Sequence, residues 1–251
     1  MTDPQWALLA GDLGHDSYPA PLRVGVLRGP GAYARARDEL RAAGLLRAGR
    51  VDADLEDALR LLHRPAIWFD SLWLPEAGSD ALARVVVASS GIIGVSATQH
   101  PAQSGVTAIE VIGGAGLAAA VVGRLPTERP GRRPAVTVPV DPAAAHDDDG
   151  QDSGSVLVSS TDRGHSPARD HAIAAAILDA PHPRAGQISA NVRDFTGTVH
   201  RSAVLRWYDN EADGRYQVEL SWCGDRLEIS PADPKRLGDA IQRLLPAPAR
   251  R

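Results

Sequence analysis

The stretch TAIEVIGGAGLAAAVVGRLP at residues 107–126 is repeated in outline near the end of the chain, as DRLEISPADPKRLGDAIQRLLP at residues 225–246. Each copy predicts a short strand, a turn, an amphipathic helix and then a leucine followed by a proline. Five positions correspond: Glu110 with Glu228, Leu117 with Leu237, Ala120 with Ala240, Leu125 with Leu245 and Pro126 with Pro246. Two copies of one supersecondary unit usually bury their faces against each other. The sequence therefore predicts one pseudo-symmetric body rather than two independent domains.

The pattern upstream of each copy is also shared. In both halves a helix ends at a proline and is followed by strands, with the turn signals SSG and DNEADG marking antiparallel pairs. The expected strands are 66–74, 82–89, 92–98 and 106–112, then 187–194, 198–207, 215–222 and 226–230. The expected closing helices are 116–125 and 234–245. This order predicts an α+β fold, a pseudo-two-fold repeat with a central antiparallel sheet flanked by helices.

The chain is expected to form a single domain over residues 1–251, with repeats at about 50–126 and 166–246. Residues 127–165 are rich in proline, acidic and small residues, which is typical of a linker, with one short strand at 135–140. The part near 143–155 is expected to be mobile and dispensable for folding. Residues 1–30 are interpreted as an extended lead-in. Asp52 and Asp233 are predicted N-caps of the helices that follow them.

The bulk composition excludes several classes of protein. A net charge of −4 and a pI of about 6.1 give no electrostatic reason to expect nucleic acid or an anionic membrane as partner. No apolar run approaches the roughly 20 residues that a membrane helix needs, and no secretory signal is visible, so a cytoplasmic protein is expected. The single cysteine, Cys223, excludes an internal disulfide and is interpreted as a small buried residue on a strand.

The glycine-rich turn at Gly113–Gly116 is the one motif that suggests chemistry. Residues 114–119 fit the dinucleotide fingerprint G-x-G-x-x-A after a strand and before a helix, so a nucleotide-dependent small-molecule enzyme is an alternative function. The next segment, PTERPGRRP, cannot form the central strand that such a fold requires. The equivalent turn of the second copy, SPADPK, lacks the glycines. We therefore favour a structural turn, and we expect no enzyme, no catalytic residues, no cofactor and no metal site.

Aromatic residues are few, and they gather on equivalent strands of the two halves. Trp68, Phe69 and Trp73 lie in the first expected strand, and Trp207 and Tyr208 lie in a hairpin of the second half, next to Val204. Adjacent residues of a strand point to opposite faces of the sheet. One face must be core, and the other could be covered by a helix or could bind a partner. Six residues are therefore candidate partner contacts: Trp68, Phe69, Trp73, Val204, Trp207 and Tyr208. If these residues prove to be core, the helices or the loops at 75–80 and 209–214 are the next candidates.

Three strings together resemble the EspG family of ESX (type VII) secretion-associated proteins of actinobacteria. They are LRAAGLLRAGRVDADLEDALRLLHRP at residues 40–65, FTGTVHRSAVLRWYDNEADGRYQV at 195–218 and LEISPADPKRLGDAIQRLL at 227–245. The most telling piece runs from Leu205 to Tyr216 and contains the turn Asp213-Gly214-Arg215-Tyr216. The resemblance extends from about Pro21 to Leu245, in family order.

The resemblance implies a cytosolic, ATP-independent chaperone with a pseudo-two-fold α+β fold. Such a protein would bind a helical secreted substrate, a PE–PPE heterodimer or another ESX-type protein, and keep it soluble. It would use a groove or sheet face rather than a catalytic site. A homodimeric scaffold is a further alternative, and the sequence leaves open whether the chain is a monomer or a dimer.

Overall fold

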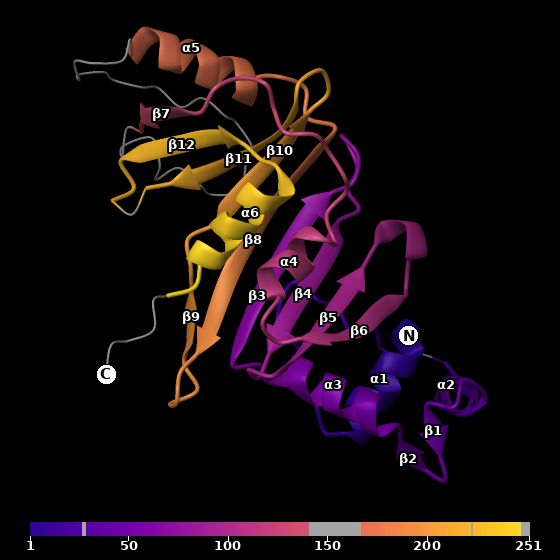
Figure 1. Ribbon diagram of the computed structural model, residues 1–251. Coiled ribbons are helices and arrows are strands. Elements are labelled where there is room, and N and C mark those ends of the chain that lie inside the picture. Colours follow the sequence, from indigo (N-terminus) through magenta and orange to yellow (C-terminus); the bar gives the residue numbers. More distant parts are fainter. Residues whose placement is uncertain (27–28, 141–166, 222, 247–251) are drawn as a thin grey trace.

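The computed structural model describes residues 1–26, 29–140, 167–221 and 223–246. Its main feature is a ten-stranded sheet in which neighbouring strands run antiparallel (Figure 1). Helices lie against both faces of this sheet. The predicted α+β class, with a central antiparallel sheet flanked by helices, is therefore confirmed.

The elements follow the expected order in both halves. The first half contains α1 (Asp3–Asp12), α2 (Ala32–Ala42), β1 (Leu46–Arg47), β2 (Arg50–Val51), α3 (Ala53–His63), β3 (Ile67–Leu74), β4 (Ala83–Ser89), β5 (Ile93–Gln99), the short 3-10 helix η1 (Pro101–Gln103), β6 (Thr107–Gly113) and α4 (Leu117–Val122). The second half contains β7 (Val136–Pro139), α5 (Pro167–Leu178), β8 (Arg184–Arg193), β9 (Val199–Arg201), β10 (Leu205–Asn210), β11 (Gly214–Leu220), β12 (Arg226–Pro231) and α6 (Pro234–Arg243).

The two halves join through the pairing of β3 with β8 at the centre of the sheet. The strand order is β6-β5-β4-β3-β8-β10-β11-β12-β7, and β9 pairs with β8 beside this path. β7 is the additional edge strand beside β12. Outward from the β3–β8 pair, the first half contributes β3, β4, β5 and β6 in chain order, and the second half contributes β8, β10, β11 and β12. This is the arrangement that two copies of one unit require. The exact repeat bounds, 50–126 and 166–246, stay a prediction.

Local signals explain where the main helices begin. The Asp52 carboxylate accepts a hydrogen bond from the backbone N–H of Leu55 at 3.2 Å, and Asp233 accepts one from Arg236 at 2.7 Å. Both are N-caps, as predicted, and Pro234 occupies a position where its missing N–H costs nothing. The caps fix the first turns of α3 and α6.

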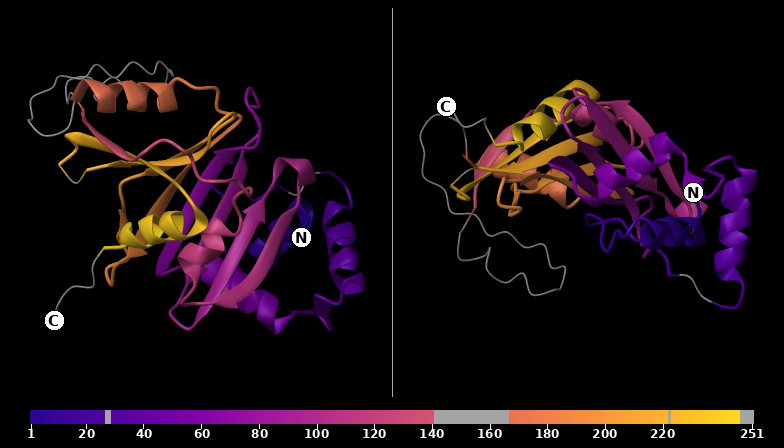
Figure 2. Two further views of the ribbon diagram at one scale, coloured as in Figure 1. Left: turned by 45° about the horizontal axis from the view of Figure 1, so that its top comes forward. Right: turned by 90° about the horizontal axis from the view of Figure 1, so that it is seen from below.

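The helices divide the core into three clusters. On one face, α4 and α6 lie side by side over the centre of the sheet and pack on Phe69, Trp73 and Trp207 (Figure 1). On the opposite face, α1, α2 and α3 pack with Trp68 over the first half. The third cluster joins α5 and β7 to β11 and β12. In the left view of Figure 2, α5 and the N-terminus lie at opposite ends of the molecule.

The extended lead-in predicted for residues 1–30 is wrong, because α1 forms there and buries Trp6, Leu8 and Leu9. The signal was present in the sequence: the Gln5 side chain accepts a hydrogen bond from the backbone N–H of Thr2 at 3.0 Å, as in a capping box. The helix was missed because its apolar residues form a short run without clear helical spacing. Its stability comes instead from burial in the first core cluster, where α2 is its main packing partner.

Two smaller expectations also fail. The single strand predicted at 198–207 is divided into β9 and β10, because Ser202 interrupts the pairing and its hydroxyl accepts a hydrogen bond from the Ala190 N–H at 2.9 Å. Cys223 is exposed in a turn rather than buried on a strand. The short strand expected at 135–140 is confirmed as β7. The expected mobility of residues 143–155 concerns positions outside the described residues.

Candidate protein-binding surfaces

Four of the six candidate contact residues lie in the core. Phe69 and Trp207 have no exposed surface, and Trp68 and Trp73 are each 5% exposed. Trp68 faces α1 and α3, whereas its neighbour Phe69 faces α4 and α6, so both faces of β3 are covered. In this conformation these four side chains present almost no surface to a partner. A contact role for them stays a prediction that the burial does not favour.

Val204 and Tyr208 are the two candidates that keep part of their surface. Both are half-buried, Val204 just before β10 and Tyr208 within it. Tyr208 lies opposite Ala185 of β8, and Ala185 lies opposite Leu74 of β3. Tyr208 is therefore near the end of the sheet that carries both the β3–β4 loop (75–82) and the β10–β11 turn (211–213). Much of both connections is exposed, including Ala77 and Ala212.

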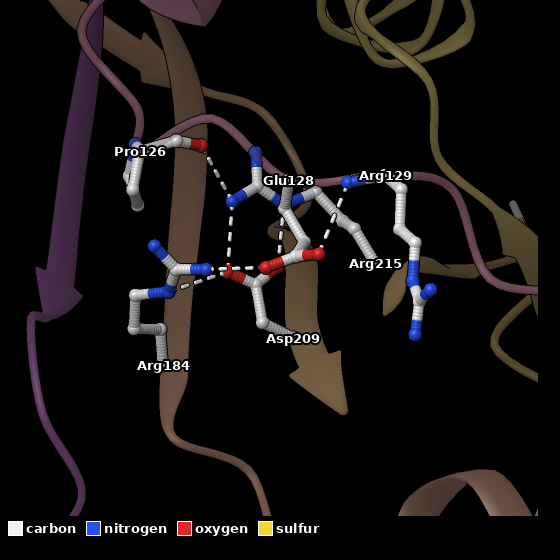
Figure 3. A network of polar contacts seen from close by, with 6 residues as sticks. All are labelled: Pro126, Glu128, Arg129, Arg184, Asp209 and Arg215. Atoms are coloured by element: carbon white, nitrogen blue, oxygen red, sulfur yellow. Dashed lines mark hydrogen bonds and ion pairs between the residues drawn. The ribbon is translucent and has the colours of Figure 1, made fainter. Parts of the chain in front are cut away.

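An ion network centred on the buried Asp209 joins the strands at this end of the sheet (Figure 3). The Asp209 carboxylate accepts hydrogen bonds from Arg215 at 2.6 and 2.9 Å and lies 2.9 Å from Nε of Arg184. Arg184 also donates to Glu128, and Arg215 donates to the carbonyl of Pro126 at 2.9 Å. The network ties three strands of the second half to the segment that leaves α4. A surface built on these strands is therefore preorganised.

A second polar network lies at the junction of the two halves. Arg201 of β9 donates to both carboxylate oxygens of Asp70, at 2.8 and 2.9 Å, and Asn191 donates to the same carboxylate at 2.7 Å. Burial raises the pKa of the Asp70 carboxyl, although the hydrogen bonds from Asn191 and the charge of Arg201 oppose this effect. The network binds β3, β8 and β9 across the central strand pair. The donors Arg201 and Asn191 both belong to these strands, which indicates a structural role.

The glycine-rich turn is explained by packing. The backbone N–H of Gly114 donates to the carbonyl of Ile92 at 2.9 Å, so the turn lies directly on the β4–β5 turn. A Cβ atom at Gly114 would lie 2.2 Å from the carbonyl oxygen of Gly91, closer than any real contact. In addition, α4 does not lead into a parallel strand, because the whole sheet is antiparallel. The glycine requirement therefore follows from a close backbone approach, not from a phosphate.

We expect Gly114→Ala to destabilise the protein by about 1–3 kcal/mol, because the added methyl group meets backbone that cannot turn aside. Gly113→Ala is the matched control, since a Cβ there has nothing within 4 Å. Denaturant unfolding of both variants checks this result. Equal stability of the two variants would show that the two turns do not pack as described.

The described residues contain no group of three or more histidine, cysteine, aspartate or glutamate side chains placed to hold a metal ion. Within the same residues, no helix is both long enough and apolar enough to cross a membrane. Large apolar side chains are also present on the described surface. Eight large hydrophobic residues are exposed in the described part of the chain: Val26, Tyr33, Ile92, Ile93, Val111, Phe195, Val199 and Leu220. Where such side chains adjoin, as Ile92, Ile93 and Val111 do, the exposed apolar patch points to a protein contact.

Comparisons with known proteins agree with this picture. The model of the EspG family matches residues 2–243 of the chain. Among solved structures, the chain is similar to the type VII secretion system chaperone EspG5 of Mycobacterium tuberculosis, whose structure contains the PE25–PPE41 dimer. That similarity has a TM-score of 0.67 at 18% identity and covers 98% of this chain and 96% of the other. No curated protein matches the chain. The structural likeness establishes a shared fold over nearly the whole length.

Proposed function

Because this chain belongs to the EspG family, we propose that it is a chaperone of type VII secretion that binds a helical PE–PPE heterodimer and keeps it soluble. The family match over residues 2–243 is the observation that carries the proposal. The fold shared with EspG5, a chaperone solved with its PE25–PPE41 partner, supports it. Binding a preformed helical pair requires a rigid surface with a few apolar anchors inside a polar rim.

The function needs no catalysis, and we infer that the protein is not an enzyme and acts in the cytoplasm. The alternative of a nucleotide-dependent enzyme loses its main support, because Gly114 is explained by its contact with Gly91 and Ile92.

We place the substrate contact at the end of the sheet formed by the β3–β4 loop, the β10–β11 turn and Tyr208, with Val204 as a second contact farther along β10. Two observations support this choice. Tyr208 and Val204 are the candidate contacts with surface left, and the Asp209 network holds the adjoining strands in one arrangement. The loops beside them are exposed and project beyond the strands.

We expect the wild-type chain, co-expressed with a PE–PPE pair, to raise the soluble fraction of the pair and to co-elute with it in size-exclusion chromatography. Ala77→Arg, Ala212→Arg and Val204→Glu should each weaken the complex by about 2 kcal/mol or more if they lie at its centre, because a charge is placed in a desolvated contact. Titration calorimetry with the purified pair measures this loss.

Ala42→Arg is the matched control, because Ala42 is exposed on α2, far from this end of the sheet. It should leave affinity unchanged. A wild-type chain that neither solubilises nor binds any PE–PPE pair would contradict the proposed function. Normal binding by all three surface variants would leave the function intact and move the contact to another surface.

A further inference from the structure

A groove is lined by residues of α3 and of the outer strands β5 and β6. These elements lie in the half of the molecule away from α5 (Figure 1). We call this groove the α3 groove. Its volume is about 510 Å³, its floor consists of Ile93, Val95 and Val111, and its wall is formed by α3 with Leu61. Ile93 is 52% and Val111 is 55% exposed, although both are apolar strand residues. Ile92, at the adjoining turn, is 91% exposed. Three of the eight exposed large hydrophobic residues are thus concentrated at this place.

The groove is open because the sheet extends beyond the helices that cover it. β6 pairs only with β5 in the described structure. The N-terminus occupies the start of its free edge, where Met1 and Thr107 exchange two hydrogen bonds of 2.7 and 2.8 Å. Beyond Thr107 none of the described residues pairs with this edge. The α3 residues Leu59 and Leu62 are buried in the core, but the helix does not cover Val111 of β6. A partner that covers the groove would therefore bury apolar surface already present in the folded chain.

The charges along the groove indicate which partner fits. The wall carries Asp54 and Asp57 in the first part of α3, Arg60 in its last part and Arg64 directly after it. Arg60 forms exposed ion pairs with Glu56 and Asp57 on its own helix, both at 2.6 Å. Asp54 and Arg64 form no ion pair within the described residues. Exposed pairs of this kind contribute little and can be exchanged. One half of the wall is therefore acidic and the other half is basic, with two charged side chains in each half.

We propose that the α3 groove is the contact surface of a homodimer, in which a second copy packs its α3 antiparallel to the first. A two-fold axis near the middle of the helix then places Asp54 and Asp57 opposite Arg64 and Arg60 of the other copy. A contact between identical surfaces must be complementary to itself, and this order of charges satisfies that condition. The apolar floors of the two copies meet between the helices. A partner of uniform charge would match only half of the wall.

This dimer does not depend on the proposed chaperone function. The groove lies beside the turn at residues 90–92, whereas the substrate contact proposed above lies at the other ends of β3 and β4. The register of these strands separates the two places, since Ile67 pairs with Ser89 at one end and Trp73 pairs with Ala83 at the other. Both surfaces can therefore be occupied at once.

The test uses two charge-reversal variants of the full chain. Asp54→Arg with Asp57→Arg makes the whole wall basic, and Arg60→Asp with Arg64→Asp makes it acidic. We expect the wild type to be a dimer by sedimentation equilibrium and each variant alone to dimerise about tenfold more weakly or worse, because like charges then face each other. An equimolar mixture of the two variants should restore dimers that contain one copy of each. A change confined to the stability of α3 would not produce this recovery on mixing.

The apolar floor is tested separately with Val111→Glu, which should abolish dimerisation. Leu220→Glu is the matched control, because Leu220 is a strand residue that is 45% exposed in the other half of the sheet. It should leave the dimer intact, and melting temperatures show that both variants fold. A wild type that stays monomeric up to its solubility limit would overturn the proposal. So would a mixture of the charge variants that fails to form mixed dimers.

Discussion

Replacing Asp209 by alanine is expected to destabilise the protein by about 3–5 kcal/mol, because removal of one partner leaves a buried charge without compensation. The side chain of Asp209 is 1% exposed and that of its partner Arg215 is 6% exposed. Without the carboxylate, the Arg215 guanidinium keeps only the carbonyl of Pro126 and the face of Trp207, whose ring centre lies 4.4 Å away. Arg184 also loses one of its two acidic partners.

Urea unfolding followed by fluorescence measures this effect, with Asp239→Ala as the control. Asp239 also accepts from a cation, Lys235 at 2.7 Å, but both side chains are largely exposed. Loss of that solvent-screened pair should leave the stability nearly unchanged. If Asp209→Ala costs no more than Asp239→Ala, the network in Figure 3 is not the element that holds the segment after α4 against the second half.

Replacing Trp207 by alanine is expected to cost about 3–5 kcal/mol, because it removes a fully buried indole from the core and leaves a cavity. Trp207 is fully buried and lies 6.2 Å from Trp73, measured between ring centres. The space around it is closely filled: a Cβ atom at Gly186 would lie 2.7 Å from the indole ring. The neighbouring side chains therefore have little room to collapse into the cavity.

This experiment also separates a core role from a contact role for the buried aromatic residues. Denaturant unfolding and PE–PPE binding are measured on the same Trp207→Ala protein, with Leu220→Ala as an exposed control. A core residue lowers stability and affects binding only through unfolding. A variant that keeps wild-type stability but loses the partner would instead restore Trp207 as a contact residue, against its burial.

The sequence by itself determined the elements whose signals are local. The caps at Asp52 and Asp233, the turn residues between strands and the alternation within strands depend on neighbours a few positions away. These signals predicted the antiparallel α+β class and the matching strand-turn-helix endings before any tertiary contact was known. They failed at residues 3–12, where the helix depends on burial of Trp6, Leu8 and Leu9 rather than on regular spacing.

Which side chains are covered was decided only by the tertiary structure. Trp68 and Phe69 point to opposite faces of β3, so the sequence predicts that one of them could meet a partner. Both are buried because α1 and α3 cover one face and α4 and α6 cover the other. In the sequence, Val111 has the pattern of an ordinary strand residue. It is exposed because β6 is the last strand of the sheet on this side and no described helix covers it there. Periodicity sets the direction in which a side chain points, whereas its burial depends on packing between elements far apart in the sequence.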